Sequence, residues 1–289
     1  MLAQSTLRTA FLTALAMIAF AANSVLARMA LAGTGIDAVS YTSVRLMAAA
    51  IMLVALVSLR GGSRASLSID PLSAFTLFGY AFAFSLAYLR LETGMGALIL
   101  FGFVQLTMIG WGAAIGERMG LLQWGGVLLA CSAFIYLMSP GLSAPDPLGA
   151  ALMAVSGVCW GVYSLAGRRT SGGDPLLRTA SNFLWSLPFM VAAAVIYSVF
   201  IGQEISLPTD GMALAVISGA VTSGAGYAIW YSALRGLSAT QGGIVQLSVP
   251  IIAAIGGVIF VAEPLGLRLT LSAVLILGGI ALTMVKARA

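Results

Sequence analysis

The stretch FAANSVLAR, at residues 20–28, recurs in altered form as WGVYSLAGR, at residues 160–168. Two further matches follow in the same order along the chain: GYAFAFSLAYLRLETG (79–94) with AGYAIWYSALRGLSAT (225–240), and AAIGERMG (113–120) with VIFVAEPLG (258–266). The last match sets Glu117 against Glu263. The offset between the copies drifts slightly along the chain, as expected for an old duplication with small insertions. We therefore divide the chain into two repeats, residues 1–144 and residues 145–289.

The composition of the chain requires a lipid environment. Hydrophobic residues make up 60% of the 289 residues and charged residues only 8%, whereas a soluble domain has about 25% charged residues. About 20 apolar residues cross the hydrocarbon core as a helix. Breaks at Gly, Pro and charge clusters then predict ten spans, at 8–27, 37–59, 70–89, 93–115, 121–139, 147–167, 175–200, 211–233, 238–261 and 267–286.

Each repeat holds five predicted spans, and this odd number places the second repeat upside down in the membrane. Such inverted-topology repeats are typical of secondary transporters, whose substrate sites lie near the bilayer midplane between the repeats. The predicted fold class is therefore an all-α membrane protein with ten transmembrane helices, arranged as two inverted five-helix repeats.

Basic residues indicate the orientation of the spans. With the N-terminus inside, ten basic residues fall at the inner ends: Arg8, Arg60, Arg64, Arg118, Arg168, Arg169, Arg178, Arg235, Lys286 and Arg288. Only Arg28, Arg90 and Arg268 fall in the predicted outer loops. This positive-inside bias predicts a multi-pass protein of the cell inner membrane with both termini in the cytoplasm.

Several functional classes are disfavoured by what the sequence lacks. The chain has no histidine, the commonest general base and metal ligand. Cys131 and Cys159 lie in apolar runs without metal-ligand spacing. No HExxH motif, Ser–His pair or nucleotide-binding loop is present. We therefore expect no enzyme activity, no cofactor, no metal and no nucleic acid partner. The predicted partners are the lipid bilayer and a small solute, and we expect a monomer.

The order of the motifs resembles a known family. Two five-span repeats carry ANSVLAR near the start, Arg45 in the second span, Pro250 in the ninth, and GERMG or AEPLG after the fourth and ninth. Together these features are similar to the EamA branch of the drug/metabolite transporter superfamily, and within it to the YddG-type amino-acid exporters. The resemblance covers nearly the whole chain. It implies a basket-shaped ten-helix bundle that exports aromatic and other neutral amino acids.

Two departures from related proteins affect the mechanism. The fourth span of the family usually contains a Pro where this chain reads FGFVQL (101–106). Small multidrug pumps of the same superfamily rely on an acidic residue in the first span, where this chain offers Met17, Ile18 and Asn23. No carboxylate falls in the middle of any predicted span. Proton-coupled export of cationic drugs is therefore disfavoured, and facilitative transport is expected.

Polar and aromatic side chains within the spans are the candidate binding residues. Placing a polar group inside the membrane costs free energy, so such a group usually has a function. Amides could donate to a carboxylate and accept from an ammonium group, or they could form interhelical hydrogen bonds. Aromatic rings could hold a cation, or they could be packing and interface anchors. The predicted substrate-binding residues are Asn23, Tyr80, Phe101, Gln105, Trp160, Tyr163, Gln246 and Pro250, the last because it frees a main-chain carbonyl.

Arg45 is the only charge well inside a predicted span. It could face a substrate carboxylate or lock a closed state. Alternatively, it could pair with backbone carbonyls or extend its side chain to the membrane interface. We assign it a gating or structural role.

These observations predict an inner-membrane transporter that exports neutral or aromatic amino acids by alternating access. Two alternatives remain open: an exporter of another small metabolite or drug-like molecule, and a membrane scaffold that transports nothing. The duplicated, inverted arrangement argues against the scaffold.

Overall fold

The computed structural model describes residues 2–60, 69–116, 119–141, 144–169, 174–200, 205–237 and 239–284. These residues form helices and connecting loops, and no strand occurs among them. Nine of their helical segments are long and apolar enough to cross a membrane, and Leu267–Thr283 is a shorter apolar helix. The all-α membrane fold predicted from the sequence is thereby confirmed.

The first repeat contains five continuous helices: α1 (Leu2–Gly33), α2 (Ala38–Leu59), α3 (Pro71–Tyr88), α4 (Thr93–Ala114) and α5 (Leu121–Met138). The second repeat is less regular. Its helices are α6 (Pro147–Arg169), α7 (Pro175–Val195) with the π-helical turn η2 (Ile196–Phe200), α8 (Thr209–Ile217), η3 (Ser218–Ala225), α9 (Gly226–Leu234), α10 (Ala239–Gln246), α11 (Ser248–Val261) and α12 (Leu267–Thr283). The segments α8, η3 and α9 form one span, and α10 and α11 form another.

Acidic side chains begin several helices. Asp37, Asp70 and Asp174 each accept a hydrogen bond from a backbone N–H in the first turn of the helix that follows, which satisfies donors that have no partner inside the helix. The other four described acidic residues, Glu92, Asp146, Asp210 and Glu263, also lie at helix ends. The midmembrane parts of the described helices therefore contain no carboxylate.

One span differs from its predicted extent. We predicted the first span at residues 8–27 with Arg28 in an outer loop, whereas α1 continues to Gly33 and includes Arg28. No proline or glycine interrupts the helix before Gly33. The chain turns only at Gly35, whose φ of 77° suits a residue without a side chain.

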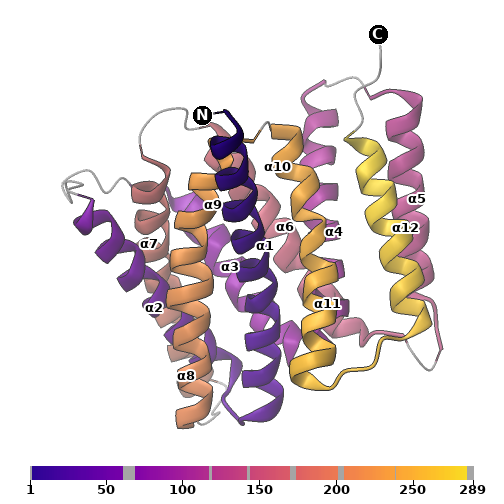
Figure 1. Ribbon diagram of the computed structural model, residues 1–289. Coiled ribbons are helices and arrows are strands. Elements are labelled where there is room, and N and C mark those ends of the chain that lie inside the picture. The colour runs from indigo at the N-terminus through magenta and orange to yellow at the C-terminus, as the bar shows by residue number, and fades with distance from the viewer. Residues whose placement is uncertain are drawn as a thin grey trace.

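Helix contacts come in pairs related by the repeat. Span three (α3) packs on α6, and its counterpart (α8, η3 and α9) packs on α1. Likewise α4 packs on α6, and α11 on α1. The pairs α2–α7, α4–α11 and α5–α12 join equivalent spans. Figure 1 shows α2 and α7 at one side of the bundle and α5 and α12 at the other. The two repeats are thus interleaved, as an inverted repeat requires.

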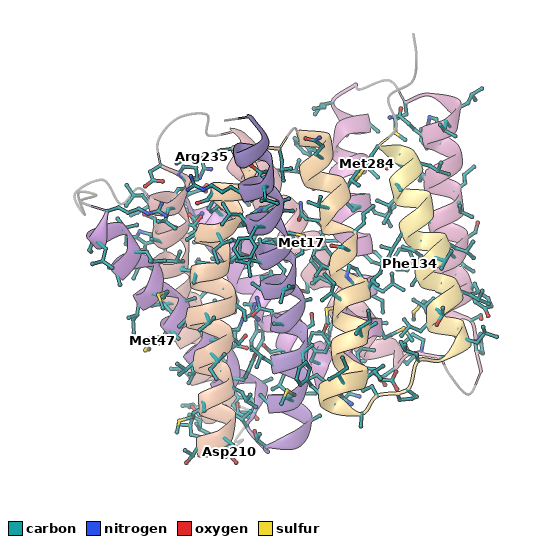
Figure 2. All side chains as sticks on the ribbon, in the orientation of Figure 1. Met17, Met47, Phe134, Asp210, Arg235 and Met284 are labelled. Carbon is teal, nitrogen blue, oxygen red and sulfur yellow. The ribbon has the colours of Figure 1, made fainter. Side chains whose placement is uncertain are left out.

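The two ends of the bundle are distinguishable. We call the end where α1 begins the near end and the end where α1 finishes the far end. The final turn of α12 also lies at the near end (Figure 1). Arg235 lies at the near end and Asp210 at the far end (Figure 2). Glu117, which the repeat alignment matches with Glu263, lies outside the described residues.

The outer surface of the bundle is apolar. Large hydrophobic side chains such as Met47, Leu128 and Val274 are exposed, and Met47 points away from the bundle (Figure 2). An apolar patch of this extent is unusual on a soluble protein. Lipid tails would cover it in a bilayer.

Candidate functional site

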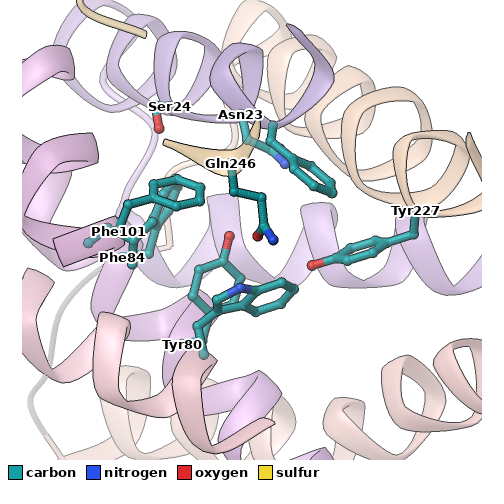
Figure 3. A pocket seen from close by; sticks show the side chains of 10 residues that line it. Asn23, Ser24, Tyr80, Phe84, Phe101, Tyr227 and Gln246 are labelled. Atoms are coloured by element: carbon teal, nitrogen blue, oxygen red, sulfur yellow. The ribbon is translucent and has the colours of Figure 1, made fainter. Parts of the chain in front are cut away.

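A small cavity lies between the two repeats at the middle of the spans (Figure 3). Its lining residues come from six spans: Phe20, Asn23, Ser24, Tyr80, Phe84, Leu100, Phe101, Trp160, Tyr227 and Gln246. The cavity has a free volume of about 30 Å³, which is room for about one water molecule. Pockets that hold small ligands measure roughly 300–1,000 Å³. The cavity of this structure therefore has no room for an amino acid, and we refer to this arrangement as the closed state.

Five aromatic rings form a continuous band along the cavity wall. The band runs through Phe84 and Tyr80 of α3, Trp160 of α6, Tyr227 of α9 and Phe20 of α1. Successive ring centroids are 5.6, 4.8, 5.6 and 5.6 Å apart, within the usual range for interacting aromatic pairs. Because the band passes from the first repeat to the second and back to the first, a movement of one repeat against the other would change it.

The side-chain oxygen of Asn23 is held by hydroxyl groups of η3. Its Oδ1 accepts hydrogen bonds from Ser218 Oγ (2.8 Å), Thr222 Oγ1 (2.6 Å) and Ser223 Oγ (3.3 Å). Tyr41 of α2 donates in turn to Ser218 Oγ at 2.9 Å. This network orients the amide so that its nitrogen is directed into the cavity (Figure 3). Asn23 therefore presents N–H donors to the cavity.

The π-helical segment η3 makes this arrangement possible. π-helical turns within α-helices are rare and often occur at functional sites. Gly219 of η3 lies against the backbone of Arg45 on α2, where a larger residue would collide with the Arg45 carbonyl. The close approach brings the hydroxyls of η3 between α1 and α2.

The amide of Gln246 reaches the cavity from a helix break. Its Nε2 donates to the carbonyl of Gly242 at 3.0 Å, and the end of the side chain points into the cavity (Figure 3). Pro250 has no N–H to donate to the main-chain carbonyl of Gln246, four residues earlier. The helix is interrupted at Leu247, between α10 and α11. By contrast, α4 has no proline and is continuous, so the departure at FGFVQL has a structural consequence.

Arg45 is buried behind the aromatic band. Its side chain is 3% exposed, and Nη2 donates to the Tyr80 hydroxyl at 3.1 Å. Its guanidinium carbon lies 4.7 Å from the ring centroid of Phe84 and 5.5 Å from that of Tyr80. Its Nη1 has no hydrogen-bond partner. An extension to the membrane interface is excluded by this burial.

Polar contacts of Arg28 and Glu263, which we call the clamp, join the two repeats at the far end of the bundle. Arg28 Nε of α1 donates to Glu263 Oε1 at 3.1 Å, and Arg28 Nη1 donates to the Tyr88 carbonyl at the end of α3 at 2.9 Å. Glu263 Oε2 accepts the backbone N–H of Thr93, at the start of α4, at 2.8 Å. Burial raises the pKa of the nearby Glu92 carboxyl, the charge of Glu263 raises it further, and Arg28 lowers it. The clamp joins both repeats.

The predicted binding residues divide into two groups. Asn23, Tyr80, Phe101, Trp160 and Gln246 line the cavity. The other three lie elsewhere: Gln105 and Pro250 are buried outside the lining, and Tyr163 packs on Trp160 at 5.2 Å and accepts from Asn182 at 3.4 Å.

Five lining residues were absent from the predicted set: Phe20, Ser24, Phe84, Leu100 and Tyr227. Helical spacing offered a signal for two of them, because Phe20 lies three residues from Asn23 and Phe84 lies four residues from Tyr80. The sequence did not indicate a role for the hydroxyls of η3, because serines and threonines are common in membrane helices.

Known proteins resemble this chain along its length. An uncharacterized protein of Pseudomonas aeruginosa is 50% identical over 277 residues, which cover 96% of this chain and 94% of that protein. The sequence pattern of the EamA-like transporter family matches residues 147–285. The chain belongs to the EamA-like transporter family. This membership confirms the resemblance to the EamA branch noted in the sequence, and the protein is a multi-pass membrane transporter rather than an enzyme.

Two further relatives and a solved structure extend the comparison. An uncharacterized transporter of Archaeoglobus fulgidus is 25% identical, over 96% of this chain and 98% of that protein. The threonine/homoserine exporter RhtA of Salmonella typhimurium is 31% identical over 142 residues, 48% of this chain and 46% of its own length. One crystal structure matches with a TM-score of 0.66 at 19% identity, covering 94% of this chain and 96% of that one. The last match concerns the fold alone.

Proposed function

We infer that this EamA-like transporter exports neutral amino acids, with a preference for aromatic ones, across the inner membrane. The observation that carries the proposal is the midmembrane cavity, lined by aromatic rings and two side-chain amides with no carboxylate among its lining residues. Such a wall suits a solute without net charge. The partial match to a protein named as a threonine/homoserine exporter supports amino acids as the solute class.

Each part of a zwitterion has a complementary group at the cavity. The Asn23 amide offers N–H donors to a carboxylate. The Gln246 side-chain oxygen and the aromatic faces suit an ammonium group, because a cation over a ring gains about 0.5–2 kcal/mol. The remaining aromatic surface suits an apolar side chain. A site of this kind recognises the shared amino-acid backbone and tolerates several side chains.

Transport would proceed by alternating access. In the closed state the clamp of Arg28 and Glu263 joins the repeats at the far end, and the cavity is too small for a solute. Under the predicted orientation the far end faces the periplasm, so release requires the clamp to open. The described helices carry no midmembrane carboxylate to bind a proton, so we expect facilitated transport.

Counterflow into liposomes tests the proposed function. Purified protein is reconstituted with internal unlabelled phenylalanine, and uptake is measured for labelled phenylalanine, tryptophan, threonine, uridine and a cationic dye. No pH or sodium gradient is imposed. We expect uptake of the amino acids, largest for the aromatic ones. Uptake confined to uridine or the dye, or uptake that requires a gradient, would contradict the proposal.

Cavity variants localise the transport to this site. Trp160→Ala and Gln246→Ala should each lower counterflow of all the amino acids together. Trp124 of α5 is exposed on the outer surface, so Trp124→Ala is the matched control and should transport normally. Elution of each purified variant as a single species checks that the variant is folded. Normal transport by both cavity variants would remove this cavity from the proposal.

A further inference from the structure

Within the described part of the chain, Arg45 is the only charged residue that is buried. A cation at membrane depth is costly unless an anion or several acceptors compensate it. The ion pairs found among the described residues join Arg28 with Glu263 and Arg90 with Asp146, and neither involves Arg45. The closed state therefore holds a positive charge that has no ion-pair partner among the described residues and lies against two rings of the cavity wall.

The contacts of Arg45 within the bundle leave part of its guanidinium unpaired. A guanidinium that staples helices together would satisfy its donors on carbonyls, as buried polar groups normally do, yet Nη1 has no partner. Asp37, the nearest acidic residue on the same span, is already occupied: it accepts the backbone N–H groups of Ser40 (2.8 Å) and Ser206 (2.9 Å). Arg45 thus keeps unused capacity to bind an anion.

The guanidinium of Arg45 adjoins the wall of the cavity. The guanidinium packs over Phe84 and Tyr80, and both rings belong to the cavity wall. Its one hydrogen bond goes to the Tyr80 hydroxyl. A phenol is a neutral acceptor, whereas a carboxylate pairs with arginine through two charge-assisted hydrogen bonds in a planar fork. A carboxylate that reached the guanidinium would compete successfully for Nη2.

Arg45 is also linked to the other donor of the site. Tyr41 lies one helical turn before Arg45 on α2 and donates to Ser218, which holds the Asn23 amide. The donors of Arg45 and Asn23 are thereby supported by one set of contacts between α1, α2 and η3. The guanidinium of Arg45 and the amide of Asn23 therefore both place N–H donors in the same region of the bundle.

We propose that Arg45 is the receptor for a carboxylate group of the transported solute, and that the Tyr80 hydroxyl occupies this receptor in the empty, closed state. The proposal rests on the proposed function and deepens it, since it makes an organic carboxylate the required group. Binding of the carboxylate releases Tyr80 from Arg45. Because the ring of Tyr80 packs on that of Trp160 with centroids 4.8 Å apart, its release alters the aromatic band that joins the repeats.

A set of four related ligands tests the requirement for a carboxylate. Phenylalanine and 3-phenylpropionate carry it, whereas phenylalanine methyl ester and 2-phenylethylamine do not. Dissociation constants are measured on the purified protein by calorimetry. We expect the two carboxylates to bind at least about tenfold more tightly than their partners, as the loss of a charge-assisted pair predicts. Arg45→Gln should reduce this preference to less than about threefold, and Arg45→Lys should retain part of it.

Tyr80→Phe distinguishes a receptor from a structural arginine. This variant keeps the ring and removes only the hydroxyl that competes for Nη2. A receptor freed of its competitor should bind both carboxylates a few times more tightly and leave the ester and the amine unchanged. A structural arginine would lose a stabilising contact, and binding of all four ligands would weaken or stay the same.

The outcomes separate this inference from the proposed function. If all four ligands bind wild-type protein equally, or neither carboxylate binds, the carboxylate receptor is overturned even when amino acids are transported. If 3-phenylpropionate binding depends on Arg45 while no amino acid shows counterflow, the receptor stands and the proposed function fails. Should Arg45→Gln fail to fold, the wild-type preference and the Tyr80→Phe measurement decide the matter.

Discussion

At the scale of single residues, Asn23 illustrates how its neighbours determine the chemistry of a side chain. An amide can donate or accept, and its sequence position in α1 does not decide between the two. Hydroxyls of Ser218, Thr222 and Ser223 converge on its oxygen. The nitrogen is left to face the cavity, so the residue acts there as a donor.

Replacing this donor by an acceptor should impair transport. Asn23→Asp keeps the shape and one oxygen for the hydroxyls, but it turns a second oxygen toward the cavity. A hydrogen bond to a charged group contributes about 1.5–3 kcal/mol, so counterflow of phenylalanine at subsaturating concentration should fall at least about tenfold. Lower pH should restore part of the activity, because a protonated carboxyl donates again.

Tyr41→Phe is the matched control for Asn23→Asp. It removes one hydrogen bond to Ser218, whereas the hydroxyls of Ser218, Thr222 and Ser223 still hold the Asn23 oxygen, so transport should fall much less than in Asn23→Asp. If Asn23→Asp shows wild-type counterflow at neutral pH, no hydrogen-bond donor is needed at this position.

At the scale of helices, the two repeats differ in their fourth spans. The fourth span is one continuous helix, whereas its counterpart is broken at Leu247 between α10 and α11. Pro250 accounts for the break, because it lacks the N–H that would continue the helix. The broken span carries Gln246 to the cavity, and α11 reaches the far-end clamp through Glu263.

Restoring the missing hydrogen bond should slow transport. Pro250→Ala supplies an N–H for the Gln246 carbonyl and favours a continuous helix. We expect slower counterflow, and a melting temperature in detergent equal to or above that of the wild type. Pro188 also lies inside a helix, α7, but on the exposed surface, so Pro188→Ala should leave transport unchanged. Equal rates for both variants would show that the break is not used.

Weakening the clamp should open the far end. Glu263→Gln keeps an oxygen for the Thr93 N–H but loses the charge that faces Arg28. The pair is mostly buried, with side chains 20% and 10% exposed, so its loss should destabilise the closed state. In a background without Cys131 and Cys159, Ser24→Cys on the cavity wall should react faster with an impermeant maleimide added at the far side.

The control for the clamp is an ion pair at the surface. Arg90 and Asp146 are 3.7 Å apart with side chains 48% and 36% exposed, and such pairs contribute little. Arg90→Gln should therefore leave the labelling rate of Ser24→Cys unchanged. A clamp variant that labels no faster than this control would exclude the Arg28–Glu263 pair as the barrier.

At the scale of the whole molecule, charge and apolar surface agree on a membrane protein with two distinct ends. The bundle exposes apolar side chains around its circumference, and the start of α1, the end of α12 and Arg235 share the near end (Figures 1 and 2). The bias of basic residues predicts that this end is cytoplasmic.

Cysteine labelling tests the orientation. Asp210 and Arg235 are exposed at opposite ends of the bundle, so Asp210→Cys and Arg235→Cys are compared in the background without native cysteines. An impermeant thiol reagent added to intact spheroplasts should modify the cysteine at 210 and spare the one at 235. The reverse pattern would invert the predicted orientation.

The sequence by itself determined the membrane fold, the number of spans and the resemblance between the halves. These follow from hydrophobic length, loop charge and repeated motifs, which are local along the chain. Among the binding residues that it predicted, Asn23, Tyr80, Phe101, Trp160 and Gln246 line the cavity, and they were chosen because polar and aromatic residues inside a span are conspicuous. It did not separate them from Gln105, Pro250 and Tyr163, which are equally conspicuous but lie outside the cavity lining.

Only the tertiary structure decided which groups meet. Arg28 was expected in a loop, yet it pairs with Glu263, 235 residues away. The hydroxyls of η3 orient Asn23 from a span some 200 residues later, and Arg45 is left without an anion behind Tyr80. Partners of this kind depend on how helices pack and rotate against one another. Packing is a sum of many weak contacts between distant segments, and no local pattern of residues encodes it.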